Sequence, residues 1–151
     1  MLNAFVKDII KTFPLGFVAT VTPDGRPNVS PKGTFLVLSD DKIGFADIRS
    51  PQTIKNIKYN PEVEVNFVNQ FSRKGVRIRG QAKAAAKGTD EFQKLFIDWK
   101  NEWPSLADRI NAIVTIEISH VKPLTTPPYD DGVTEEEMVE IYKQKFREIY
   151  P

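Results

Sequence analysis

Residues 76–84 read Val-Arg-Ile-Arg-Gly-Gln-Ala-Lys-Ala, and small or apolar side chains alternate there with polar ones. One set is Val76, Ile78, Gly80, Ala82 and Ala84, and the other is Arg77, Arg79, Gln81 and Lys83. Successive side chains of a β-strand point to opposite faces, so this stretch predicts a half-buried strand. A strand with one apolar and one polar face is typical of an antiparallel sheet.

Further strands are expected on both sides of this one. Residues 62–67 alternate in the same way, and residues 17–21 are an apolar, β-branched run followed by the turn-forming Pro23-Asp24-Gly25. The return strand, residues 28–32, is flanked by prolines and is therefore expected at an edge or with a bulge. A second hairpin is predicted from residues 33–38 and 42–46, and a last strand from residues 112–118.

Four helices are expected at the periphery. Asn3 can cap the first, which Pro14 ends, and Ser50 followed by Pro51 reads as the N-cap and first residue of a short second helix. Thr89 can cap a third helix, whose Phe92 and Trp99 lie on one face. Thr134 and Glu137 predict a capping box at the start of a C-terminal helix over residues 134–150, after a loop over residues 119–133. With no alternating βαβ units, the pattern predicts a mainly β chain, an antiparallel barrel with peripheral helices, in a single domain over residues 1–151.

Composition narrows the chemistry. The 151 residues carry a net charge of +1, no cysteine and one histidine, which argues against a general polyanion binder, a thiolate or histidine-rich metal site, and cysteine nucleophiles. No phosphate-binding Gly-rich motif, nucleophile elbow or H-E-x-x-H occurs. Lys7, Asp8 and Lys11 interrupt the apolar N-terminus, so no membrane segment is expected there. We expect no metal, no membrane and a cytoplasmic location.

The strongest chemical signal is the pentad Arg49-Ser50-Pro51-Gln52-Thr53 at the start of the second helix. A helix N-terminus presents free backbone N–H groups, and here a guanidinium and two hydroxyls would lie around them, which suits a phosphate monoester. The alternative is an ordinary N-cap beside an exposed arginine. Cations also outnumber acids between residues 42 and 83, although Arg and Lys on a strand face are equally consistent with a solvated surface.

Three stretches together resemble one known family. They are Phe17-Val18-Ala19-Thr20-Val21-x-Pro-Asp-Gly-Arg-Pro-Asn-Val-Ser-Pro31, Arg49-Ser50-x-x-Thr53-x-x-Asn56-Ile57-x-x-Asn60-Pro61-x-Val63, and Gly75-Val76-Arg77-Ile78-Arg79-Gly80-Gln81-Ala82. Their order and spacing are similar to those of the pyridoxamine 5′-phosphate oxidase-like, FMN-binding split-barrel family, over about residues 4–120. Each motif alone is weak, and the combination is specific.

The resemblance implies a six-stranded Greek-key split β-barrel, a homodimer, and FMN in grooves between the subunits. In relatives the flavin ring lies along the strand that matches Val29, Ser30, Pro31 and Lys32, and the turn that matches Arg49, Ser50, Gln52 and Thr53 holds the phosphate. Many relatives have a lysine where Gln52 stands, so here either the affinity for phosphate is expected to be weaker, or another cation such as Lys32 or Arg77 would replace that lysine. The chain ends in an acidic helix, without the substrate-binding Arg and His strand of true pyridoxamine phosphate oxidases, so that activity is not expected.

The resulting functional hypothesis is an FMN-dependent oxidoreductase acting on a small organic substrate, with no catalytic residue assigned. A reduced deazaflavin in the same groove, and a flavin carrier or redox sensor without a substrate, are the alternatives. A nucleic-acid module is a remote alternative, motivated by Phe71, Arg73, Lys74, Arg77 and Arg79. Tyr129, in the loop before the last helix, is a candidate to border the flavin ring, and a rigid connector is the competing interpretation.

Overall fold

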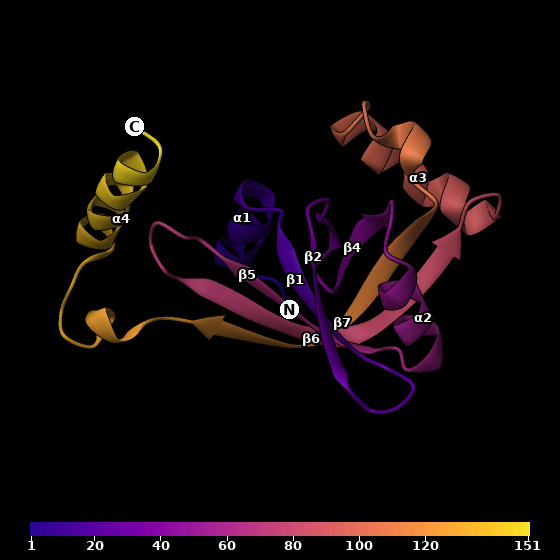
Figure 1. The fold of residues 1–151 in the computed structure, drawn as a ribbon, viewed down its shortest axis with the longest axis horizontal. Coiled ribbons are helices and arrows are strands. Elements are labelled where there is room, and N and C mark those ends of the chain that lie inside the picture. Colours follow the sequence, from indigo (N-terminus) through magenta and orange to yellow (C-terminus); the bar gives the residue numbers. More distant parts are fainter.

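The computed structural model describes all 151 residues, and its centre is one antiparallel sheet (Figure 1). The strands are β1 (Gly16–Val21), β2 (Pro27–Lys32), β3 (Leu36–Ser39), β4 (Lys42–Asp47), β5 (Glu62–Val68), β6 (Gly75–Ala86) and β7 (Ala112–Leu124). The helices are α1 (Ala4–Thr12), α2 (Pro51–Tyr59), α3 (Asp90–Glu102) and α4 (Glu135–Ile149), with short 3₁₀ turns at Ala107–Arg109 and Pro127–Tyr129. The mainly β architecture with peripheral helices is confirmed.

The sheet order is β2-β1-β5-β6-β7-β4-β3, which differs from the expected six-stranded split barrel in the number of strands. There are seven strands, and β2 and β3 end the sheet without pairing to each other. The edge position of β2 agrees with its prolines, because proline has no backbone N–H to donate to a neighbouring strand. In the turn before it, Gly25 has φ +84°, the left-handed conformation that glycine adopts at no steric cost.

Two strand boundaries differ from the expectation. β3 begins at Leu36 rather than Gly33, and β7 runs to Leu124 rather than ending at Ile118. The extra residues of β7 pair with the first half of β6 after a register shift between Arg79 and Gly80. The predicted loop over residues 119–133 is therefore shorter, because its first six residues continue the strand.

The main core lies inside the curve of the sheet. Eighteen buried apolar residues form it, and the rings of Phe35, Phe45 and Phe67 pack there with centroids 4.8–5.2 Å apart. A second cluster lies under α3, where the fully buried Trp99 donates its indole N–H to the carbonyl of Thr34 at 2.8 Å. The capping residues Asn3, Thr89 and Thr134 accept hydrogen bonds as the sequence predicted.

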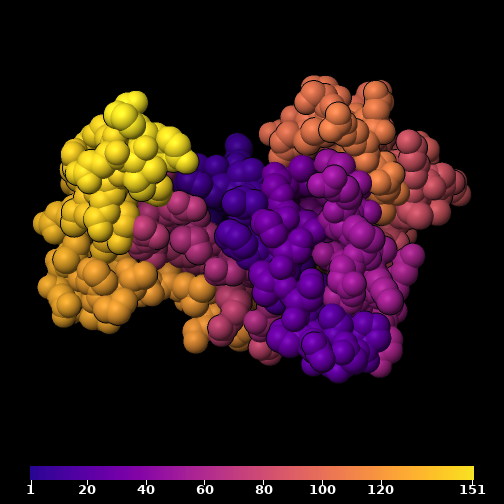
Figure 2. Space-filling model, in the orientation of Figure 1, coloured from indigo at the N-terminus to yellow at the C-terminus, as the bar shows by residue number.

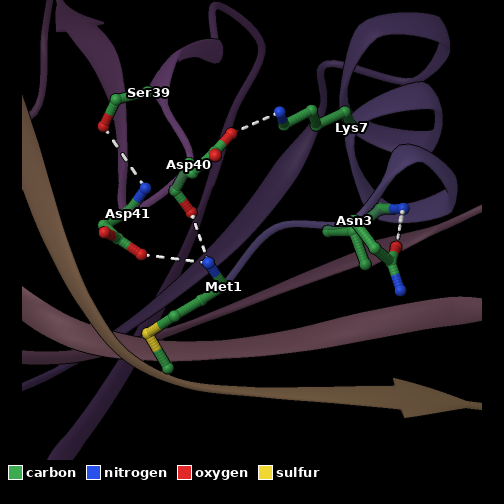
Figure 3. A network of polar contacts seen from close by, with 7 residues as sticks. Met1, Asn3, Lys7, Ser39, Asp40 and Asp41 are labelled. Carbon is green, nitrogen blue, oxygen red and sulfur yellow. Dashed lines mark hydrogen bonds and ion pairs between the residues drawn. The ribbon is translucent and has the colours of Figure 1, made fainter.

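The N-terminus is tied to the turn between β3 and β4 (Figure 3). The Met1 ammonium donates to the carbonyl of Asp40 and the carboxylate of Asp41, at 3.1 and 3.0 Å, and Lys7 bonds the Asp40 carboxylate. The hydrogen bond from Lys7 holds the pKa of Asp40 below its usual value. These contacts fix α1 against the sheet edge formed by β3.

The C-terminal helix α4 stands at the opposite end of the molecule from α3 and covers the tip of the β5–β6 hairpin (Figure 2). The rings of Phe146 and Phe71 lie 5.0 Å apart, and the Arg73 guanidinium stacks 3.8 Å from the ring centroid of Tyr142. Met138 is the one buried residue of α4. The helix is thus attached through one hairpin tip rather than through the main core.

Candidate functional site

A buried lysine joins the end of β2 to the start of α2. Lys32 is only 7% exposed, and its Nζ donates to the hydroxyls of Ser30, at 2.8 Å, and Ser50. Ser30 lies two residues before Lys32 on the same face of β2, and Ser50 directly precedes α2. One ammonium and two hydroxyls therefore converge where the strand edge meets the helix.

Asp47, the last residue of β4, faces the same region. It is 8% exposed, and its Oδ1 is buried without a hydrogen-bond partner. Burial lowers the pKa of Lys32, and the negative charge of Asp47 acts in the opposite direction. On the side facing the core, Lys32 Nζ lies 6.0 Å from the ring centroid of Phe45.

The first turn of α2 adds backbone donors. Pro51 is at the first helical position, as predicted, and the Ile54 N–H makes the first intrahelical bond, to Ser50 O at 3.1 Å. The Ser50 side chain makes no capping bond, contrary to its expected role, because its hydroxyl is engaged by Lys32. The N–H groups early in a helix have no intrahelical partners, so this uncapped turn can bind an anion.

A buried polar chain fixes the position of α2. The amide of Asn56, which is fully buried, donates to the Thr20 hydroxyl of β1 at 3.0 Å and accepts from Gln52 at 2.7 Å. Thr53 lies between them in the sequence and is 2% exposed. Of the predicted phosphate-binding residues, Gln52 is thus occupied with Asn56, whereas Arg49 is exposed and in no ion pair.

The structure separates the four predicted residues of β2 into two sets. Ser30 and Lys32 lie on the side of the cluster, while Val29 and Pro31 are exposed on the outer face of the sheet. Strand alternation makes this division unavoidable. A ligand bound along β2 would contact Ser30 and Lys32 with its anionic end, and it would reach Val29 and Pro31 only around the strand edge.

Arg77 and Tyr129 lie outside the cluster. Arg77 is exposed and lies on β6, three strands from β2. In the sheet register Pro31 of β2 pairs with Phe17, Phe17 with Asn66, and Asn66 with Arg77, so Arg77 is about 14 Å from Pro31 at the usual strand spacing. The Tyr129 hydroxyl donates to Ser72 O, and the Lys74 ammonium lies 4.7 Å from its ring centroid. Burial raises the pKa of Tyr129, which Lys74 partly offsets. A role for Tyr129 at a flavin ring stays a prediction, testable by iodide quenching of bound flavin in Tyr129→Ala.

Sequence reasoning did not assign Asp47, Asn56 or Thr20 to the site. Each is a polar residue in an otherwise apolar pattern, and that was the available signal. No group of three or more His, Cys, Asp or Glu side chains is placed to hold a metal ion, and no helix has the length and hydropathy to cross a bilayer.

The donor set fits a phosphate monoester. It comprises an ammonium, hydroxyls, an arginine within reach of the same helix start and unpaired backbone N–H groups, all of which are phosphate donors in proteins. The Asp47 carboxylate is the one group with the wrong charge for such a ligand.

Comparisons with known proteins agree with this fold. HupZ of Group A Streptococcus is 25% identical, with a TM-score of 0.72 over 83% of this chain and 96% of that chain. An FMN-binding protein of Syntrophomonas wolfei is 16% identical, with a TM-score of 0.64 over 81% and 85%. HutZ, a heme storage protein of Vibrio cholerae, is also 16% identical, with a TM-score of 0.64 over 82% and 94%.

No curated protein matches this chain. The family model described as pyridoxamine 5′-phosphate oxidase matches residues 2–126, which include every strand. They also include Ser30, Lys32, Asp47 and Ser50, here called the α2 cluster, and leave out the tail with α4. Fold, motif order and model agree, so the chain belongs to the pyridoxamine 5′-phosphate oxidase family.

Proposed function

We propose that this protein binds FMN, with the phosphate at the start of α2, and acts as a flavin-dependent oxidoreductase on a small organic substrate. The observation that carries the proposal is the cluster in which Lys32 joins Ser30 and Ser50 at an uncapped helix N-terminus. A buried ammonium held by hydroxyls is costly unless an anion uses it. FMN supplies such an anion.

Each residue of the cluster has a distinct task in this proposal. Lys32 would provide the main charge, Ser30, Ser50 and Thr53 hydroxyl donors, and Arg49 an outer guanidinium. The first-turn N–H groups of α2 would complete the phosphate shell. Bound FMN would accept and return a hydride or single electrons, and the protein would position it and exclude competing reactions.

The family supports a flavin, and one structure with this fold is an FMN-binding protein. Oxidation of pyridoxamine phosphate itself is not proposed, because the segment after β7 forms the acidic helix α4 rather than a further strand. A flavin carrier remains the second candidate, favoured by the lack of any acid or base at the cluster other than Lys32 and Asp47. Reduced protein that passes electrons to oxygen alone would favour the carrier.

We also propose that the protein works as a homodimer. The outer face of the β1–β2 hairpin is apolar: Phe17, Ala19 and Val21 on β1 lie opposite Pro31, Val29 and Pro27 on β2. Phe17 is 39% exposed and Val29 is 64% exposed. Contiguous exposed apolar surface of this kind is typical of a protein interface. This face adjoins the β2 edge, so a second copy there would also enclose a ligand at that edge.

The test is the absorption spectrum of the purified protein, followed by FMN titration of Lys32→Met and of the exposed Lys87→Met as a charge-matched control. Loss of a charge-assisted bond predicts about 10- to more than 100-fold weaker FMN binding for Lys32→Met alone. A heme Soret band, a deazaflavin spectrum, or equal FMN affinity in both variants would contradict the proposal.

A further inference from the structure

We propose that Asp47 is a positioning residue that keeps Lys32 protonated, so that the α2 cluster continues to bind an anion at alkaline pH. The choice of FMN as that anion rests on the proposed function, whereas the effect of Asp47 on Lys32 protonation does not. Asp47 would not touch the ligand, and its effect would pass through the lysine.

The geometry gives Asp47 no ordinary structural role. A buried carboxylate in a folded protein is normally hydrogen-bonded or ion-paired, because burying an unsatisfied charge is costly. Asp47 Oδ1 is buried without a partner, and no cation lies within 4 Å of the carboxylate. Its backbone, in contrast, is satisfied, since its carbonyl accepts from Asn111 at 2.9 Å. What the Asp47 side chain contributes at this position is therefore its negative charge.

The charged groups around the pair leave one source of negative charge. Ser30 and Ser50, which bond Lys32, are neutral, and Arg49 beside them is a cation. On the far side of Asp47, Lys55 and Lys58 of α2 line the crevice that it faces. Burial disfavours the charged form of Lys32, and Asp47 is the one charged group that favours it.

Two effects of removing this carboxylate have opposite signs. Burial lowers the pKa of Lys32 and Asp47 raises it, so a neutral residue at 47 makes the lysine lose its proton at lower pH. The same change removes a repulsion between Asp47 and a bound phosphate. At acidic pH, where Lys32 is charged in either case, the repulsion decides and affinity stays equal or rises. At alkaline pH the lost proton decides and affinity falls.

The experiment uses the full chain with Asp47→Asn, and Asp98→Asn on the exposed face of α3 as a matched control. Titration of the lysine ε-carbon signals by NMR, without ligand, reports the protonation of Lys32 directly. Because the negative charge of Asp47 raises the pKa of Lys32, D47N should move the Lys32 midpoint to lower pH. D98N should leave it unchanged.

FMN titration from pH 6 to pH 10 then measures the consequence. D47N should bind FMN at least as tightly as the natural protein at pH 6, and progressively more weakly than the natural protein once the pH exceeds its lowered Lys32 midpoint. The double variant Lys32→Arg with D47N should lose this pH dependence, because arginine stays protonated. Asp47→Glu should restore the natural midpoint.

An unchanged Lys32 midpoint in D47N, or affinity reduced by the same factor at every pH, would overturn the proposal. If D47N does not fold, as judged by circular dichroism, Asp47→Ser provides a smaller neutral side chain for the same measurements. A protein that binds no FMN would overturn the proposed function, while the ligand-free NMR titration would still decide the role of Asp47.

Discussion

Lys32 shows how a single residue can serve binding at the expense of stability. Its position on the inner face of β2 places a charged group where an apolar one would be expected. Desolvation lowers its pKa, so in the natural pH range the fold carries the cost of a buried ammonium, partly offset by the hydrogen bonds to Ser30 and Ser50. The proposed phosphate ligand would account for a residue that weakens the ligand-free fold in this way.

The first prediction follows from linkage. Because the folded pKa of Lys32 lies below its unfolded value of 10.5, the folded state binds fewer protons between these two values, and the Lys32 contribution to stability rises with pH in that window. Lys32→Met removes this dependence. Urea denaturation should find Lys32→Met most stable, relative to the natural protein, below the folded pKa. The advantage should shrink as pH approaches 10.5, and a constant difference would contradict the argument.

The second prediction concerns the outer donors. Arg49 is exposed, so Arg49→Ala should leave thermal stability unchanged while weakening FMN binding by about 1.5–3 kcal/mol, the loss of a bond to a charged group. Thr53 is 2% exposed, so Thr53→Ala should lower both stability and affinity. Fluorescence titration and thermal melts separate the two effects. Unchanged FMN affinity in the double variant Arg49→Ala/Thr53→Ala would show that the turn over residues 49–53 does not bind the phosphate.

At the scale of elements, most of the fold could be predicted because local patterns and tertiary structure agree. The caps Asn3, Thr89 and Thr134 and the turn at Gly25 are short-range chemistry, and the structure confirms all four. The length of β7 could not be read from the sequence, because His120 to Leu124 pair only with β6, beyond the register shift, and that partner is distant in sequence. Whether the end strands β2 and β3 pair with each other depends in the same way on contacts between residues distant in sequence.

The site was predictable only in part, and for a related reason. The pentad at 49–53 predicted a helix start with spare donors, which the structure has at α2. The contribution of Lys32, Asp47 and Asn56 depends on which face of a strand or helix each occupies beside another element. Alternation assigns a face to Lys32, but the partner across that face, Ser50, is eighteen residues away. Only the three-dimensional arrangement brings the two together.

The third prediction belongs to α4. The contact between Phe146 and Phe71 joins this helix to the β5–β6 hairpin tip, and Met138 alone is buried. Phe146→Ala should therefore speed amide hydrogen exchange in α4 and in residues 69–74, with no change in α2 or β4. Ile149→Ala, at a residue that is 62% exposed, is the control and should have no effect. Uniformly faster exchange over the whole sheet would mean that α4 stabilises more than the hairpin.

For the whole molecule, the open sheet determines how the site can be completed. The anion cluster lies at the β2 edge, and no strand covers that edge within one chain. The apolar outer face of the β1–β2 hairpin begins at the same edge. An exposed strand edge beside an exposed apolar face invites pairing with another chain. One symmetric contact between two copies would thus bury the outer face of the β1–β2 hairpin and enclose a ligand at the β2 edge. Dimerisation and ligand binding are therefore expected to depend on each other.

The fourth prediction tests that connection. Val29→Lys places a charge in the centre of the apolar face, where its burial against a second copy would be costly, but leaves the inner cluster of Ser30 and Lys32 unchanged. Sedimentation velocity should find the natural protein dimeric and Val29→Lys monomeric, with FMN affinity lost in parallel. Ile97→Lys, at a similarly exposed apolar residue on α3, should remain dimeric and retain flavin. A Val29→Lys monomer that keeps the natural FMN affinity would show that one chain holds the cofactor unaided, and would separate the phosphate cluster from the interface.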